Sequence, residues 1–194
     1  MVTGVPVIGL LAVQGGVAEH ERHLERLGAA VRRVRRPGEL DGIDGIVLPG
    51  GESSAMRRLL TTVGLWEPLR ERVRSGLPAF GTCAGMILLS GGDDADPGLG
   101  GVDIRVQRNA FGSQAASFES ELDVDGVEGG PMRGVFIRAP LVRSCGVGVQ
   151  VLARVGDRPV AARQGAVLVT AFHPELTGDL RMHRLFLAGV SGSV

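Results

Sequence analysis

The pattern of hydrophobic positions changes about halfway along the chain. In the first half, short apolar runs such as residues 5–13 alternate with segments such as 17–29, where apolar residues recur at helical spacing. Continuous apolar runs are typical of strands buried on both faces of a parallel sheet. The expected order is strand, helix, strand, strand, helix, strand, helix, which predicts right-handed crossovers and a doubly wound α/β sheet.

The second half shows short apolar strands with no helices between them. The expected strands lie at 102–111, 117–124, 134–140, 149–155, 158–164 and 166–172, and they predict antiparallel additions to the sheet. Thr177 is the expected cap of a closing helix within 176–190, and Ser53 or Ser54 the expected cap of an earlier helix. No repeat or linker interrupts the chain, so residues 1–194 are expected to form a single three-layer, flavodoxin-like domain.

Composition narrows the classes of function. With 194 residues, 44% of them hydrophobic, the chain can bury a sizeable core. Its formal net charge of +0 gives no reason to expect a nucleic acid or a membrane surface as partner, and the basic run at 32–38 is interpreted as a solvated strand or helix end. No apolar stretch approaches the roughly 20 residues of a membrane span, and no secretory signal is visible, so a cytoplasmic location is expected.

The cationic side chains are all arginine, 21 in number, and the chain has no lysine. It therefore cannot form a Schiff base or place a P-loop lysine on a phosphate, and acid–base chemistry falls to four histidines, the carboxylates and the thiols. Cys83 and Cys145 lack the spacing of a zinc site, and the aspartates within 91–101 lack that of a calcium loop. No metal ion and no cofactor is expected.

Three segments carry reactive groups to the carboxyl ends of expected strands, where the sites of parallel sheets lie. The segment "GTCAG" at 81–85 matches a nucleophile elbow, in which Cys83 sits on a sharp turn and the following helix favours its thiolate. A small buried cysteine explains this motif alone almost as well. Cys145 precedes an expected strand and no helix, so it is interpreted as structural.

The segment "FHPE" supplies a base for this nucleophile. Pro174 is expected to hold the chain extended, so that His173 and Glu175 lie side by side and the carboxylate orients the imidazole. A strand-end histidine with a solvated glutamate remains the alternative. His20 and His23, on a helix rich in arginine and glutamate, and His183 on the closing helix are interpreted as surface groups.

The segment "LPGGES" offers the backbone N–H groups of Gly50 and Gly51 to an oxyanion, and Glu52 to a substrate ammonium. An ordinary strand-to-helix turn explains the two glycines equally well. Arg108 and Arg138 are candidates to clamp a substrate carboxylate, because a guanidinium presents two parallel donors.

Taken together, these segments resemble the class I glutamine amidotransferases, and more closely the glutaminase subunits of pyridoxal 5'-phosphate synthase, the PdxT/SNO family. The motifs are "LAVQGGVAEH", "LPGGESSAM", "FGTCAGMILL", "VQRNAFGSQ", "FIRAP" and "FHPELTGDLRMH", and they span almost the whole chain. The pieces "GTCAG" and "HPE" point only to the broader superfamily, whereas "LPGGES", "RNAFG", "FIRAP" and "FHPELTGD" in this order and spacing are far more specific. The family commonly has serine and arginine where this chain has Ala110 and Ser113.

The resemblance implies hydrolysis of L-glutamine to glutamate and ammonia through a glutamyl thioester, with the ammonia passed to a separate lyase-type synthase subunit in a large hetero-oligomer. It implies that Cys83 is the nucleophile, His173 the base and Glu175 its orienter. The positions matching the family's glutamine contacts are Gly51, Glu52, Ser53, Arg108, Ile137 and Arg138. It also implies a subunit nearly idle until docking. The loop 12–16 is the candidate coupling element, because its glycines permit a peptide flip.

Three other functions stay open on the sequence. The chain could be the glutaminase subunit for another acceptor, such as the one in histidine biosynthesis, although "RNAFG" and "FHPELTGD" weigh against it. It could be a cysteine-elbow redox protein or hydrolase of the DJ-1 kind, which would need an acidic neighbour for its thiol. A non-catalytic binding module using the "PGGES" turn is the third.

Overall fold

The computed structural model describes residues 4–92, 97–108 and 117–192, and its centre is a seven-stranded sheet. The strand order is β2 (Ala30–Val34), β1 (Val7–Leu11), β3 (Gly45–Leu48), β4 (Ala79–Thr82), β11 (Val167–Thr170), β10 (Arg158–Gln164) and β9 (Gln150–Val155). The first five strands in this order are parallel. The expected α/β fold with a largely parallel sheet is confirmed.

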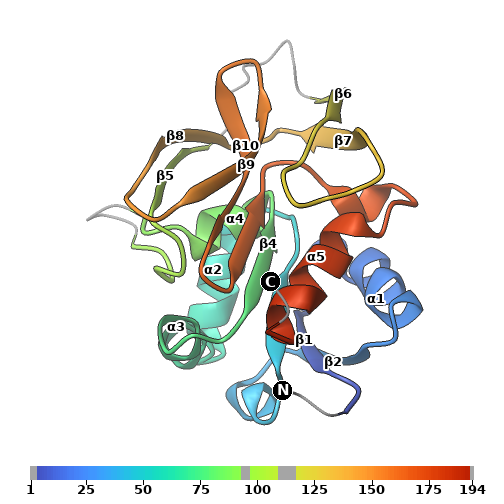
Figure 1. Ribbon diagram of the computed structural model, residues 1–194. Helices are drawn as coiled ribbons and strands as arrows, with labels where there is room; N and C mark the ends of the chain where they lie inside the picture. The colour runs from blue at the N-terminus through green and yellow to red at the C-terminus, as the bar shows by residue number, and fades with distance from the viewer. Residues whose placement is uncertain (1–3, 93–96, 109–116, 193–194) are drawn as a thin grey trace.

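Helices cover both faces of this sheet (Figure 1). One face carries α1 (Val17–Arg26) and α5 (Arg181–Val190), and the other carries α2 (Ser53–Thr62), α3 (Trp66–Arg74) and α4 (Ala84–Leu89). β1, β3, β4 and β11 are almost entirely buried, because helices pack on both of their sides. Their continuous apolar runs are the reason that these strands could be predicted, whereas α3 was not expected as a separate helix.

The second half builds a cap of antiparallel strands above the carboxyl ends of the parallel strands (Figure 1). β9 and β10 join the central sheet antiparallel, as expected. The other strands form two separate two-stranded sheets, β5 (Ile104–Gln107) with β8 (Leu141–Cys145) and β6 (Ser117–Leu122) with β7 (Met132–Ile137). The expected antiparallel additions to the central sheet are thus confirmed for β9 and β10, whereas the strands at 102–111, 117–124 and 134–140 do not extend it, and β8 was not expected.

Two helix caps differ from the sequence prediction. Neither Ser53 nor Ser54 caps α2: the Glu52 carboxylate accepts the backbone N–H groups of Ser54 and Ala55, at 3.0 and 2.6 Å. An ionised side chain at this position also interacts favourably with the helix dipole, so it competes well with a hydroxyl. This capping lowers the pKa of Glu52 through the same two backbone hydrogen bonds.

Thr177 does not cap the last helix, because α5 begins only at Arg181. Its hydroxyl instead donates to the carbonyl of Pro174 at 3.0 Å and accepts the N–H of Asp179 at 3.2 Å. The turn after the "HPE" segment, η2 (Pro174–Leu176), is thus tied to the residues that lead into α5.

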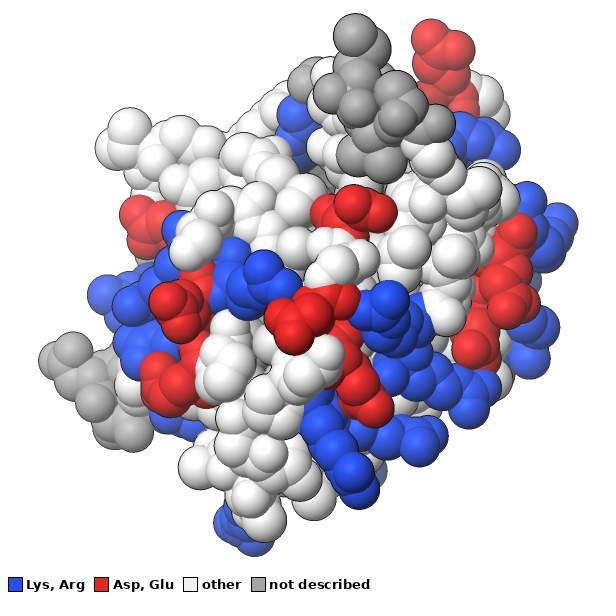
Figure 2. Space-filling model, turned by 90° about the horizontal axis from the view of Figure 1, so that it is seen from below, with Lys and Arg blue, Asp and Glu red and all other residues white. Residues whose placement is uncertain are grey.

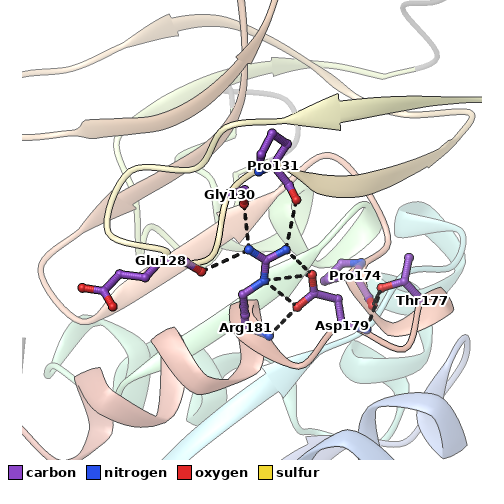
Figure 3. Close-up of polar contacts among 7 residues, drawn as sticks. All are labelled: Glu128, Gly130, Pro131, Pro174, Thr177, Asp179 and Arg181. Carbon is purple, nitrogen blue, oxygen red and sulfur yellow. Dashed lines mark hydrogen bonds and ion pairs between the residues drawn. The ribbon is translucent and has the colours of Figure 1, made fainter.

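Arg181 joins this same turn to the loop between β6 and β7 (Figure 3). Its guanidinium forms two-point contacts with the carboxylate of Asp179, at 2.6 to 3.0 Å, and donates to the carbonyls of Glu128, Gly130 and Pro131. A planar guanidinium can make these bonds simultaneously, which an ammonium could not. The cap strands and the start of α5 are therefore held in one arrangement.

Charged side chains are mixed over the face opposite the cap. Figure 2 shows arginines and carboxylates interspersed there, with neither sign gathered into one field. Part of the basic run lies in β2, where Arg33 pairs with Glu21 at 2.5 Å. Within the described ranges, no helix has the length and apolar character that crossing a membrane requires.

Candidate functional site

Three neighbouring strands bring the reactive segments of the sequence to one place. β3, β4 and β11 are adjacent and parallel, so the residues after them share the carboxyl edge of the sheet. They surround a cavity of about 490 Å³, a size suited to a small ligand. The lining residues include all the predicted site residues, namely Gly50, Gly51, Glu52, Ser53, Cys83, Arg108, Ile137, Arg138, His173 and Glu175.

Cys83 sits on the sharp turn that the sequence predicts between β4 and α4. Its φ of +50° lies in the left-handed region, which a non-glycine residue rarely adopts without strain. The flanking glycines permit this turn: a Cβ on Gly85 would lie 2.0 Å from the carbonyl oxygen of Leu48, and one on Gly81 would lie 2.6 Å from the Gly85 backbone. The residue is 7% exposed and lies at the cavity, as a nucleophile requires.

His173 and Glu175 lie side by side, as predicted, although by a different backbone path. The chain does not continue extended through Pro174 but turns into the short 3-10 helix η2. This turn brings His173 Nδ1 within 2.7 Å of Glu175 Oε1. The backbone N–H of His173 donates to the carbonyl of Val135 in β7 at 2.8 Å, so the cap strands also position the imidazole.

The environment of His173 favours its protonated form. Burial by itself lowers the pKa of this imidazole, but hydrogen bonds to Cys83 and Glu175, together with their charges, raise it to about 10. Glu175 is only 4% exposed and points its Oε1 at the ring, so the carboxylate fixes Nδ1 as a donor. At neutral pH the site therefore holds an imidazolium between the Cys83 sulfur and the Glu175 carboxylate.

Gly50 allows the β3 turn to approach the imidazole closely. A Cβ at this position would lie 2.4 Å from His173 Cε1, a distance that no relaxed contact reaches. We expect Gly50→Ala to displace the ring and to lower turnover about 100-fold, because misplacement by about 1 Å has this effect on catalytic groups. The kcat of the variant measures this. Gly38→Ala is the matched control, since a Cβ there meets nothing within 4 Å, and equal losses in both variants would contradict the prediction.

The remaining predicted residues line the cavity in different ways. The carbonyl of Ile137 accepts the Cys83 S–H at 3.8 Å, and Arg138 follows with a positive φ of 45°. Arg108 donates to the hydroxyl of Ser54 at 2.7 Å, so its guanidinium is held against the start of α2. The Glu52 carboxylate is engaged in capping α2 but stays exposed at the cavity.

The interpretation of three histidines as surface groups was wrong. His20 and His183 are fully buried and His23 is 6% exposed. On α1, His20 is three residues after Val17 and four before Leu24, so it lies on the apolar stripe despite the charged composition of the helix. Helical spacing was the signal that could have identified it as buried.

The other sequence predictions concern residues outside the cavity. Cys145 is half-buried at the end of β8, and burial raises the pKa of its thiol. Ala110 and Ser113 lie outside the described residues, as does part of the aspartate loop. Among the residues with described positions, no cluster of histidine, cysteine and carboxylate side chains could hold a metal ion.

Comparison with known proteins adds relatives that match over nearly the whole chain. The SNO glutamine amidotransferase family matches residues 10–191. A pyridoxal 5'-phosphate synthase subunit PdxT from Parafrankia sp. (strain EAN1pec) is 59% identical over 186 residues, covering 94% of this chain and 92% of the relative. The subunit of that name from Thermobifida fusca (strain YX) is 59% identical over 196 residues, covering 96% and 98%. A crystal structure of a glutamine amidotransferase superposes with a TM-score of 0.88 at 47% identity, covering 97% and 100%.

Proposed function

Because the chain belongs to the SNO glutamine amidotransferase family, we propose that it is the glutaminase subunit of a pyridoxal 5'-phosphate synthase. It hydrolyses L-glutamine to L-glutamate and supplies the ammonia to a separate synthase subunit. The observation that carries this proposal is the juxtaposition of Cys83, His173 and Glu175 at one cavity, in a chain 59% identical to proteins of that name. One apolar core links β1, β4, β11 and the cap, which supports a single glutaminase domain over residues 1–194.

In the first half of the proposed reaction, Cys83 Sγ attacks the side-chain carboxamide carbon of glutamine as a thiolate. The backbone N–H groups of Gly50 and Gly51 stabilise the oxyanion. His173 is already protonated at neutral pH, since its pKa is raised to about 10, so it donates a proton to the departing nitrogen. The C–N bond breaks, neutral ammonia leaves, and a glutamyl thioester remains on Cys83.

In the second half, the now neutral His173 accepts a proton from water, whose oxygen attacks the thioester carbonyl. The C–S bond breaks, the Cys83 thiolate and the imidazolium return, and glutamate leaves with the release of one proton to solvent. Throughout, Glu175 holds the ring by accepting from Nδ1. Gly51, Glu52, Ser53, Arg108, Ile137 and Arg138 contact the substrate, with Glu52 at its ammonium and the arginines at its carboxylate.

Docking on the lyase-type synthase subunit activates the site, in a cytoplasmic hetero-oligomer. The loop that carries this coupling is residues 12–16: the side chain of Gln14 accepts the backbone N–H of Glu52 at 3.0 Å, and Gly15 lies against the Gly50 carbonyl. A peptide rotation in this loop would thus reach the oxyanion site directly. Ile137 and Leu176, which are 39% and 48% exposed beside the cavity, provide apolar surface for the docked partner.

The decisive experiment mixes the protein with a pyridoxal 5'-phosphate synthase subunit and follows pyridoxal 5'-phosphate formation with glutamine as the nitrogen source. We expect formation with glutamine, and a glutamyl adduct on Cys83 detectable by mass spectrometry. Failure with glutamine but success with ammonium salts would remove the glutaminase assignment. Activity with a different acceptor enzyme would indicate another amidotransferase, and a thiol that forms only oxidised products would favour a protein of the DJ-1 kind.

A further inference from the structure

Three histidines form a buried chain directly behind the proposed catalytic residues. His20 Nδ1 lies 2.8 Å from His183 Nε2, and His183 Nδ1 lies 3.3 Å from His23 Nδ1. The first and last of these come from α1 and the middle one from α5, so the chain bridges the two helices on this face of the sheet. The rings of His20 and His183 also pack nearly perpendicular to the ring of Phe80.

The inner end of this chain contacts both halves of the site. His20 Nε2 lies 3.5 Å from Glu175 Oε2 and 3.3 Å from the hydroxyl of Thr82, which directly precedes the nucleophile. Glu175 uses Oε1 for His173, and within the described part of the chain its Oε2 has no hydrogen-bond partner. Burying a carboxylate oxygen without a hydrogen-bond donor costs free energy, so an arrangement in which the nearest N–H donates to it is favoured.

The order of the contacts links the proton positions of the three rings to one another. If His20 Nε2–H points at the carboxylate, then Nδ1 of a neutral His20 must accept from His183 Nε2–H. Nδ1 of a neutral His183 must in turn accept from His23 Nδ1–H. The opposite direction would place a lone pair of His20 against Glu175, and a charge-assisted bond to a carboxylate outweighs a neutral one.

From this geometry we infer that His20 is a positioning residue for the reaction: neutral His20, oriented by His183 and His23, donates Nε2–H to Glu175 Oε2 and thereby holds that carboxylate against His173. The hydrogen bond from His20 to Glu175 is inferred from the contacts alone, whereas its effect on the reaction rests on the proposed function. His20 touches neither substrate nor reacting atoms, so it acts only through Glu175. The expected effect is on kcat rather than on KM.

The pKa shifts of the three histidines are consistent with neutral imidazoles. Burial, and then the positive charge that His183, His23 and His173 would carry, hold the pKa of His20 well below its usual range. Burial and His23 lower the pKa of His183 to about 3. For His23, burial, Arg26 and Arg22 lower the pKa, while the Thr177 backbone and Glu175 oppose the shift. Cys83 and Glu175 are the groups that face His173 itself.

A kinetic test compares three variants in the complex with the synthase subunit. We expect His20→Leu to lower kcat roughly 10–100-fold, by analogy with the loss found when the hydrogen-bond partners that orient metal-ligating side chains are mutated. In the same variant, the alkaline limb of the pH profile of kcat, which we assign to deprotonation of His173, should move to lower pH. The reason is that a loosened Glu175 no longer stabilises the imidazolium. In His20→Gln, the amide N–H can replace Nε2–H, so both kcat and the position of the alkaline limb should return most of the way to their wild-type values. Leu24→Val, buried on the same helix, is the control for packing and should shift neither.

Two further measurements keep the inference separate from the proposed function and from any folding failure. The pH dependence of Cys83 alkylation by iodoacetamide, followed by peptide mapping, reports the same imidazolium without glutamine or a partner. In the unmodified protein, ¹⁵N shifts of its four histidines should show His20 as the Nε2–H tautomer at pH 7. An Nδ1–H tautomer there, unchanged kcat and pH profiles in His20→Leu, or equal effects in Leu24→Val would each overturn the inference. Loss of glutaminase activity in the wild-type complex would instead overturn only the proposed function.

Discussion

Cys83→Ala is expected to abolish glutamine hydrolysis, lowering turnover by about 10⁴-fold or more, as removal of a covalent nucleophile generally does. Without the sulfur no thioester forms, and neither the oxyanion donors nor His173 can transfer the amide nitrogen by themselves. The measurement is ammonia release from glutamine in the presence of the synthase subunit. Since alanine replaces a side chain that is small and buried, the variant should fold and dock normally.

The chain offers a matched thiol control for this prediction. Cys145 is also a free cysteine, but it lies at the end of β8 and does not line the cavity. Cys145→Ala should keep full turnover. The Cys83→Ala complex should also still make pyridoxal 5'-phosphate when ammonium salts replace glutamine. Measurable glutamine-dependent turnover in Cys83→Ala would remove Cys83 from the mechanism.

Stability is expected to fall between pH 6.5 and pH 5, by about 1.5 kcal/mol through His183 and further through His20, because two fully buried histidines resist protonation in the folded state. The pKa of His183 is lowered to about 3 and that of His20 lies well below its usual range, whereas both groups take up protons near pH 6.5 when the chain unfolds. The unfolded state therefore binds more protons in this window, so the free energy of unfolding decreases as the pH falls.

His173 gives the opposite dependence on the alkaline side. Its pKa is raised to about 10, so above pH 6.5 the folded state holds a proton that the unfolded state has lost, and stability declines toward pH 10. Urea unfolding at several pH values should thus show a maximum near pH 6.5. His183→Gln should flatten the acid side and His173→Gln the alkaline side. A profile that is flat between pH 6.5 and 5 in the unmodified protein would contradict the burial of neutral histidines.

The sequence predicted the parts of the structure that depend on short-range patterns. Continuous apolar runs identified β1, β3, β4 and β11, and the two glycines around Cys83 identified the elbow, since close packing at Gly81 and Gly85 leaves no room for a side chain. The segment "FHPE" correctly placed His173 beside Glu175, because two residues so close in the chain meet in either an extended or a 3-10 geometry. The catalytic roles of these residues stay predictions.

What the sequence missed depended on which of several available partners a side chain or strand selects. Glu52 displaced two serines as the cap of α2, and Thr177 bonded within its own turn. The cap strands are short and pair with strands outside the central sheet, so their division into β5 with β8 and β6 with β7 could not be read from local pattern. The charged residues around His20 led to its interpretation as a surface group, although its helical spacing from Val17 and Leu24 could have identified it as buried.

The strand order has a consequence for how the chain folds as it is synthesised. β4 and β11 are parallel neighbours, with Thr82 opposite Thr170, yet the whole antiparallel cap lies between them in sequence. Until residue 170 has been made, β4 is an open, apolar edge, the kind of surface on which unfinished chains aggregate. Contacts of such long sequence separation also form slowly. The nucleophile is therefore synthesised well before its base, and the two meet only when the last sheet strand inserts between β4 and β10, so a partly made chain carries no assembled site.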